Sequence, residues 1–578
     1  MRILLKNILL STTIIFVLSA CNKPPTEPTS SIASASIADA IYFGGDIVTI
    51  NDAQPNAEAI AVKDGKISFV GSMAEADKFK GEQTQSVDLA GKTLMPSFID
   101  SHSHYINMLS VANQAKLYAP PAGPGKDVDT IIATLKKFAA DRKIPKGEMI
   151  MAYGYDDTVM PDGRLLNRDD LDAAFPDNPV RVDHVSMHGT VLNTAALKFY
   201  GVDPKMPTPE GGVVVRKPGT DEIGGLIMET AFLPVFEKSE QMTPEQELAN
   251  TRAAQLAYAE AGITTAQEGA THLSILQTLR RASDADANII DVIAFPFVTD
   301  LDKILAEFPR STWLTYNKGM KIGGVKISID GSPQGKTAAF TNPYLVPGPS
   351  GEVNWKGEMF ASQEIINDAL KNVYALDVPV LFHVNGDAAI DALFVAHEFA
   401  NVDTPDKKRN VTAIHAQFTR SDQIKAYVKY GIRPSYYTLH TYYFADAHIK
   451  QRGREQTDFI SPMRASIDAG LRPTNHTDAV VAPLDQMFML WSAVNRVSRG
   501  GEVIGADQRV TPIEGLKTMT LWAAEQYDEQ SSKGSLEVGK LADLVILDQN
   551  PLKVEPMAIK DIKILETIKE GKSIYRAQ

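Results

Sequence analysis

The chain is poor in the residues that mark several classes of protein. It has a single cysteine among 578 residues, so no disulfide can form within it. Its net charge is −13, and we find no cluster of basic residues and no zinc-finger or RNA-binding signature, which argues against nucleic acid as a partner. With 44% hydrophobic and 22% charged residues, the composition is that of a globular protein with a large core.

The first 21 residues have the layout of a secretory signal. Arg2 and Lys6 precede the apolar run NILLSTTIIFVLSA, which is too short for a comfortable membrane span and is followed by Cys21. The tetrapeptide LSAC resembles the bacterial lipobox, whose cysteine is lipidated; a plain cleaved signal with a chance cysteine is the alternative. Residue 22 is Asn and not the Asp that resembles an inner-membrane retention signal. We therefore expect a lipid anchor in the outer membrane, facing the periplasm.

Strand-rich segments are predicted at both ends of the chain, after a flexible tether over residues 22–38 that is rich in Pro, Thr and Ser. Residues 39–92 contain IYFGGDIVTI and a hairpin signal at Asp64-Gly65. Residues 525–578 contain LADLVILD and a turn signal at Glu570-Gly571. Because chain termini often lie close together, we expect the two segments to form one small β-sandwich.

Between these segments, over residues 93–524, short apolar runs alternate with longer helical ones. The strand candidates are TLMPSFIDSH (93–102), GITTAQEG (262–269), IIDVIAFPFV (289–298), GGVKISIDG (323–331), VPVLFHVNGD (378–387), NVTAIHAQ (410–417), GIRPSYYT (431–438) and LRPTNHTD (471–478). Eight such units predict an α/β fold with a (β/α)8 TIM-like barrel. Residues 105–261 are too long for one connection, so we expect a large insertion with its own helices that covers one barrel face as a lid or wall.

Polar residues stand within or just after several of these apolar strands. They are His102 and His104 on the first strand, Lys326 on the fourth, His383 on the fifth, His415 on the sixth and Asp478 on the eighth. Singly, each has an ordinary structural explanation, such as a satisfied core histidine or a helix cap. Catalytic residues of such barrels gather at the carboxyl ends of the strands, so the joint placement predicts a metal site there.

These motifs resemble the metal-dependent amidohydrolase superfamily and, within it, the branch called amidohydrolase family 3. The similar segments include LMPSFIDSHSH, GGVKISIDGS, FHVNGDAAID, IHAQ, the TD of NHTDAV and KGSLEVGKLADLVILD, and the resemblance covers nearly everything from residue 38 onward. It implies a binuclear centre in which His102, His104 and Asp478 bind one divalent ion, His383 and His415 bind the other, and a carboxylated Lys326 bridges both. These donors suit Zn²⁺, with manganese, iron and cobalt as alternatives.

The resemblance also implies a hydrolase of carbon–nitrogen bonds other than peptide bonds, in amides, N-acyl or N-formyl amines or cyclic amides. A metal-activated water would attack, and Asp478 would carry the proton. Two other interpretations stay open, namely a non-catalytic lipoprotein that binds a ligand in the same pocket, and a lyase or esterase on the same scaffold.

Other residues are weaker candidates. His188, Asn193 and Glu229 in the insertion are candidates for substrate binding. His476 shares a strand face with Asp478, so it is either a rival ligand or polar filling one layer deeper in the barrel. We expect Asp100 to be an outer carboxylate that orients the ligands.

Overall fold

The computed structural model describes residues 37–111, 114–238 and 243–578. The sequence-predicted signal, the lipobox at Cys21 and nearly all of the tether fall in residues 1–36 and lie outside the described residues. Among the helices in the described ranges, none is long and apolar enough to cross a membrane.

Eight strand positions follow one another in chain order around the core of the molecule. They are β6 (Phe98–Ile99), β13 (Ile263–Thr271), β14 (Asp291–Pro296), β15 (Met320–Ile322) continuing as β16 (Val325–Ser328), β17 (Val380–Val384), β18 (Val411–His415), β19 (Arg433–Tyr436) and β20 (Thr474–Asn475). Neighbouring strands pair in parallel within two sheets, one from β6 to β15 and one from β16 to β20. A parallel bridge between Phe297 and Lys326 joins these two sheets. Between the last strand and the first, the Asp478 N–H donates to the His102 carbonyl at 3.1 Å. This confirms the predicted α/β class with a TIM-like barrel.

The barrel strands are buried along nearly their whole length, as expected of parallel strands covered on both faces. β17 reads VLFHV and β18 reads VTAIH, and every residue of both is buried. Helices that cover the strands include α7 (Pro244–Glu260), α8 (Leu273–Asp284), α10 (Gln363–Ala375), α11 (Asp387–Ala400), α12 (Ser421–Tyr430) and α17 (Gln486–Asn495). A polar side chain within such strands therefore needs a partner, which draws attention to His383 and His415.

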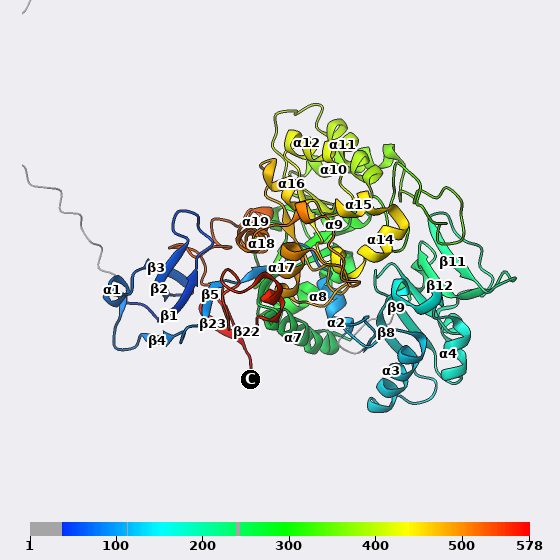
Figure 1. Cartoon of the computed structure of the whole chain (residues 1–578), viewed down its shortest axis with the longest axis horizontal. Coiled ribbons are helices and arrows are strands. Elements are labelled where there is room, and N and C mark those ends of the chain that lie inside the picture. Colours follow the sequence, from blue (N-terminus) through cyan, green and yellow to red (C-terminus); the bar gives the residue numbers. More distant parts are fainter. Residues whose placement is uncertain (1–36, 112–113, 239–242) are drawn as a thin grey trace, which may run out of the picture. The chain divides into compact units, whose positions relative to one another are not determined.

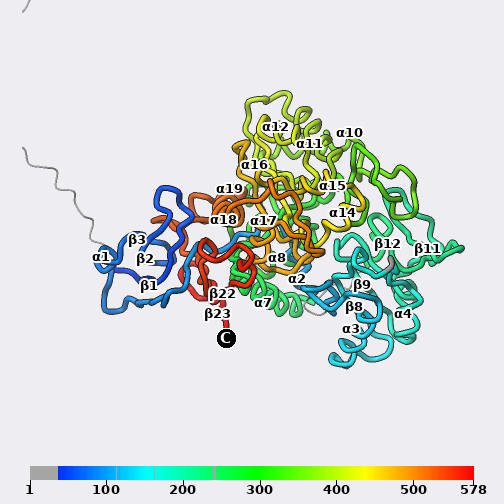
Figure 2. The backbone as a smooth tube through the Cα atoms, viewed as in Figure 1, coloured from blue at the N-terminus to red at the C-terminus, as the bar shows by residue number. Residues whose placement is uncertain are grey.

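Both chain ends contribute to a β-rich domain, whose blue and red strands lie side by side in Figures 1 and 2. A single eight-stranded sheet holds β1 (Ala40–Val48), β2 (Asn56–Lys63), β3 (Lys66–Gly71), β4 (Gln85–Asp88), β5 (Thr93–Pro96), β21 (Leu544–Leu547), β22 (Ile564–Lys569) and β23 (Lys572–Arg576). The sequence predicted one strand over residues 93–102, but the structure divides it between β5 in this sheet and β6 in the barrel. The division falls at Pro96 and Ser97, where proline has no N–H to continue a ladder.

The insertion forms a sheet of its own, which the sequence analysis did not predict. Its six strands are β7 (Ala115–Lys116), β8 (Ile150–Tyr155), β9 (Val180–His184), β10 (Gly189–Leu192), β11 (Gly212–Arg216) and β12 (Ile223–Glu229). The expected helices accompany them as α3 (Val128–Asp141), α4 (Arg168–Ala174), α5 (Thr194–Tyr200) and α6 (Leu233–Glu237). The turn between β9 and β10, the end of β12 and α6 all contribute side chains to the cavity described next.

Candidate metal centre

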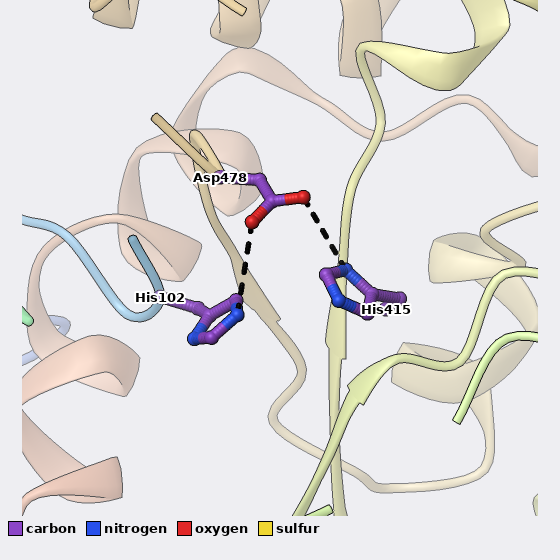
Figure 3. A group of neighbouring side chains, drawn as sticks. All are labelled: His102, His415 and Asp478. Carbon is purple, nitrogen blue, oxygen red and sulfur yellow. Dashed lines mark ion pairs between the residues drawn. The ribbon is translucent and has the colours of Figure 1, made fainter. Parts of the chain in front are cut away.

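The polar residues singled out in the sequence meet at the carboxyl ends of the barrel strands. His102 and His104 follow β6, Lys326 lies in β16, His383 in β17, His415 ends β18 and Asp478 follows β20. Figure 3 shows His102 and His415 facing the two oxygens of Asp478. The ligand atoms of these three residues lie within 4.8 Å of one another, a separation that fits a shared metal ion.

Asp478 stands between the imidazoles. Its Oδ1 lies 3.7 Å from His102 Nε2 and 3.6 Å from His104 Nε2, and its Oδ2 lies 3.9 Å from His415 Nδ1. Although Oδ1 is buried, it has no hydrogen-bond partner within the described ranges. Buried carboxylate oxygens are normally satisfied, so an unpartnered one facing two imidazole nitrogens fits a bound cation.

The imidazoles are held in the neutral form that binds metals. Burial lowers the pKa of His104 to about 3, and burial also lowers the pKa of His102 and His415 far below the ordinary value. The neighbouring Lys326 and other imidazoles act in the same direction. Each ring therefore offers a nitrogen lone pair at neutral pH.

Lys326 is buried beside these rings, with Nζ 3.5 Å from His102 Nε2. Burial lowers the pKa of its amine to about 7, although Asp478 and Glu268 act in the opposite direction. A substantial fraction of the side chain is therefore an uncharged amine at neutral pH. An ammonium has no lone pair and would repel a cation, so the lowered pKa suits a place beside metal ligands.

His383 lies next to this group without pointing its Nε2 into it. Its ring centre is 4.6 Å from that of His415. Its Nε2 lies 3.0 Å from Asn385 Nδ2 and 3.3 Å from the Gly331 carbonyl oxygen. The structure thus brings His383 to the site but not into the cluster of His102, His415 and Asp478.

Several groups around the cluster fix its geometry. Gln267 Oε1 lies 2.5 Å from His102 Nδ1, and Asp100 accepts from the Thr477 hydroxyl at 2.5 Å, which ties the first strand to the segment before Asp478. A side chain at Gly269 would not fit, because its Cβ would lie 2.3 Å from His102 Cε1. The position of Asp100 agrees with the outer role expected for it.

The backbone is strained at three residues of the site. His415, Asp478 and Glu229 have φ angles of 69°, 50° and 54°, in the left-handed region that non-glycine residues seldom adopt. Such conformations cost about 1–3 kcal/mol each and collect where function requires them.

A cavity of about 200 Å³ opens in front of Asp478 and is lined by residues of the barrel and of the insertion. His188 lines it, and its Nδ1 lies 2.9 Å from Glu229 Oε2, while Glu229 Oε1 accepts from the Thr337 hydroxyl at 2.7 Å. Burial alone would lower the pKa of His188, but the Glu229 carboxylate outweighs burial and the net shift is upward. His188 and Glu229 are thus brought together at the cavity.

Asn193 is not brought to the cavity, which corrects its place among the substrate-binding candidates. It is the N-cap of α5, where its Oδ1 accepts from the Ala196 N–H at 2.9 Å and from the Val180 N–H at 2.9 Å. Its amide donates to the Asn178 carbonyl at 2.9 Å. With its side chain used in this way and fully buried, Asn193 supports the fold of the insertion.

The structure also places two residues whose roles the sequence left open or missed. His476 Nδ1 lies 3.0 Å from the Ser435 hydroxyl and its Nε2 lies 3.1 Å from His415 Nδ1, so it packs beneath the cluster as polar filling. Glu268 at the end of β13 lines the cavity, and burial raises the pKa of its carboxyl to about 7. Its position at the end of the second strand candidate was the available signal.

Comparisons with known proteins agree with this geometry. A model of the amidohydrolase family matches residues 85–575. The putative amidohydrolase YtcJ of Bacillus subtilis is 24% identical over 548 residues, which cover 93% of this chain and 99% of the relative. The N-substituted formamide deformylase of Arthrobacter pascens is 24% identical over 551 residues, which cover 92% and 97%.

A solved structure supports the fold. The crystal structure of an uncharacterized metal-dependent hydrolase from Pyrococcus horikoshii superposes with a TM-score of 0.70 at 22% identity, covering 89% of this chain and 99% of that one. At this identity the likeness concerns the fold. Since the family model spans most of the sequence and the site can hold a metal, the chain belongs to the amidohydrolase family and is a metal-dependent hydrolase.

Proposed function

We propose that the protein hydrolyses a carbon–nitrogen bond, other than a peptide bond, in an amide, an N-acyl or N-formyl amine or a cyclic amide. The observation that carries this proposal is the unpartnered Oδ1 of Asp478, which faces His102 and His104 at the mouth of the barrel. The name of the Arthrobacter pascens relative, a formamide deformylase, supports the same class of bond.

We propose that the site holds two divalent ions, both Zn²⁺. His102, His104 and Asp478 would hold one ion, and His383 and His415 the other, once His383 exchanges its contact with Asn385 for a metal. Lys326 would bridge the two ions as a carbamate formed with carbon dioxide. The lowered pKa of Lys326 supports this step, because the uncharged amine is the form that adds to carbon dioxide.

When bound, divalent ions supply a water of lowered pKa and polarise the substrate carbonyl. Asp478 would accept a proton from the attacking water and later donate it to the leaving nitrogen. Burial raises the pKa of the Asp478 carboxyl to about 7 in the absence of metal, so the group is suited to carry a proton near neutral pH. His188, oriented by Glu229, would contact the substrate beside the scissile bond.

The proposal is tested by metal content and turnover together. Protein purified with supplemented zinc should contain two ions per chain by mass spectrometry, and a panel of formamides, N-acyl amines and cyclic amides should include a substrate. Lys326→Met should retain one ion and lose turnover. Zero metal in the supplemented protein, or turnover that survives complete chelation, would contradict the proposal, while cleavage of esters alone would favour the esterase.

We also propose that Cys21 carries a lipid that anchors the protein to the outer membrane. The sequence LSAC and the tether after it support this anchor. Fractionation should find the protein with the outer membrane, and Cys21→Ala should release it or leave it with an uncleaved signal. Recovery of the unchanged protein in the soluble periplasm would contradict the proposal.

A further inference from the structure

The cavity in front of the metal centre is lined by both apolar and uncharged polar side chains. The apolar wall is formed by Ile106, Met187, Phe236, Ile275 and Val481, which come from the barrel loops and the insertion. The uncharged polar side chains include Ser332 and Gln334 from the loop after β16. A ligand in this space therefore meets hydrophobic surface as well as hydrogen-bonding residues.

The two polar side chains are buried without partners. Ser332 and Gln334 are each 4% exposed, and neither Ser332 Oγ nor Gln334 Oε1 has a hydrogen-bond partner in the part of the chain that the structure describes. Buried polar atoms are almost always satisfied, and these two border the cavity. Their hydroxyl and carboxamide groups suit an uncharged amide, carbonyl or hydroxyl of a ligand.

No lysine or arginine is found among the described residues that line the cavity, and residues 112–113 and 239–242 contain no basic residue. His188 and His272 line the cavity, but each already faces a carboxylate, Glu229 at 2.9 Å and Asp300 at 3.1 Å. The lining also includes the carboxyl of Glu268. If a ligand carried a carboxylate into this cavity, the carboxylate would lack the cationic partner that a buried charge needs.

We propose that the substrate is uncharged: a small amide whose hydrophobic N-substituent packs on the apolar wall and whose second polar group, where present, is a carboxamide or hydroxyl that bonds Ser332 and Gln334. N-acyl amino acids with a free carboxylate are excluded. This inference rests on the proposed function only for the position of the scissile bond. An apolar cavity of about 150 Å³ accepts benzene, so about 200 Å³ with an open mouth fits about seven to ten non-hydrogen atoms.

Three formamides of matched shape test the proposal. N-formylvalinamide and N-formylvaline differ only in a carboxamide against a carboxylate, and N-isobutylformamide lacks both groups. Binding is measured calorimetrically on the Asp478→Asn protein, which should not cleave the formamides and whose bound metal is checked by mass spectrometry. The ratio kcat/KM is measured on the unmodified protein. We expect the carboxamide to bind more than about 100-fold more tightly than the acid, with the plain amide between them.

Two pairs of variants locate the effect. Phe236→Lys places a cation at the cavity and should reduce the ratio of carboxamide affinity to acid affinity by about 10-fold or more. Phe199→Lys should leave this ratio unchanged. Phe199 is a matched control, because it is 47% exposed like Phe236 but does not line the cavity. Gln334→Leu should weaken binding of the carboxamide by about 2- to 10-fold and leave the plain amide unaffected.

The outcomes separate this inference from the proposed function. If the acid binds as tightly as the carboxamide, or if none of the three binds at millimolar concentration, the inference is wrong. Cleavage of the acid in preference to the others would overturn it while supporting amide hydrolysis. If the carboxamide binds selectively but no amide is cleaved, the inference stands and the proposed reaction fails.

Discussion

The barrel has a buried cluster of charged side chains at each end of its strands. At the carboxyl end, Lys326 lies among imidazoles, and Asp478 has an unpartnered oxygen. At the other end, Asp291 begins β14 and pairs with Lys533 at 2.6 Å and with Lys569 at 2.9 Å. Lys569 also pairs with Asp543 of the β-rich domain at 3.1 Å, and Glu529 pairs with both Lys321 and Lys533.

Lys326 at one end and Lys533 at the other have pKa values shifted in opposite directions. Burial lowers the pKa of Lys326 to about 7, and the distant carboxylates do not restore it. Burial would lower the pKa of Lys533 as well, but Asp291 and Glu529 outweigh it and raise the pKa above the ordinary value. A lysine with close carboxylate partners stays charged and holds the structure together, while one without them becomes available for chemistry.

Cavity size does not distinguish the ends. The larger cavity, about 430 Å³, lies against Lys321, Glu529 and Lys533, where the ionic groups are paired. The smaller one, about 200 Å³, lies against Asp478. The pKa values of Lys326, Glu268 and Asp478, which burial shifts to about 7 in each case, identify the functional end. This agrees with the general division of barrels into a catalytic and a stabilising face.

The largest expected effect is loss of activity at the carboxyl end. Asp478→Asn removes the proton carrier while keeping the shape, so kcat/KM on a confirmed substrate should fall by about 100- to 10,000-fold. The melting temperature should change little, because Asp478 Oδ1 has no protein hydrogen bond to lose within the described residues. Near-normal turnover by the Asp478→Asn protein would show that Asp478 does not carry the proton.

The same substitution at the other end should have the reverse effect. Asp291→Asn removes the carboxylate that Lys533 and Lys569 share, although Lys533 keeps Glu529 and Lys569 keeps Asp543. It should lower the free energy of unfolding by up to about 3–5 kcal/mol, measured with urea. Activity per folded molecule should be retained. Asp284→Asn is the control, because Asp284 forms an exposed pair with Arg280 on α8 and should cost less than about 0.5 kcal/mol. A small loss at Asp291 would mean that this cluster is not stabilising.

Much of this division could be read from the sequence. Each of the eight strand candidates overlaps an observed barrel strand, and β15 lies just before the fourth candidate. This follows because buried parallel strands are continuous apolar runs bounded by helices. His102, His104, Lys326, His415 and Asp478 stood out because polar groups are rare at such positions. The predicted ligands His102, His415 and Asp478 do lie within metal-binding distance of one another.

The rest depends on contacts that a single sequence does not encode locally. From the sequence, Asn193 could not be told from a substrate-binding residue. A polar side chain that follows a strand can serve either as a helix N-cap or as a substrate contact. The sheet of the insertion was missed because several of its strands pair across long separations, for example Gly189 with Met228 and Ala115 with Ala152. The cluster of Asp291 and Lys533 joins residues 242 positions apart.

A smaller effect should follow from the residue that orients His102. Gln267→Leu removes the hydrogen bond to His102 Nδ1 and should weaken metal binding by about 10- to 100-fold in a chelator competition. Gln526→Leu is a matched control. Gln526 is also buried and donates to the same Ser101 carbonyl, at 2.7 Å, but unlike Gln267 it does not orient His102. It should destabilise the fold but change metal affinity by less than about 3-fold. If Gln267→Leu and Gln526→Leu weakened metal binding equally, Gln267 would not have the proposed role of orienting His102.

The smallest effect should be a difference in pH dependence between the two ends. Lys533 and Lys569 outweigh burial and hold the pKa of Asp291 below its ordinary value. The Asp291 carboxylate therefore stabilises the fold fully above about pH 4, and this stabilisation is lost as the pH falls through the lowered pKa. Burial raises the pKa of Asp478 to about 7 in the metal-free protein, so this group binds a proton more readily when folded and destabilises the fold as pH rises from about 4 to 7.

Differences between each variant and the parent isolate these two groups, because the other titrating residues are shared. In metal-free protein, the destabilisation by Asp291→Asn should be constant between about pH 5 and 8 and should shrink below about pH 4. The stability of Asp478→Asn relative to the parent should instead increase as pH rises from about 4 to 7. Urea unfolding across this range measures both slopes. Slopes of the same sign would mean that burial and pairing affect Asp291 and Asp478 in the same way. The proposed difference between a stabilising end and a functional end of the barrel would then be wrong.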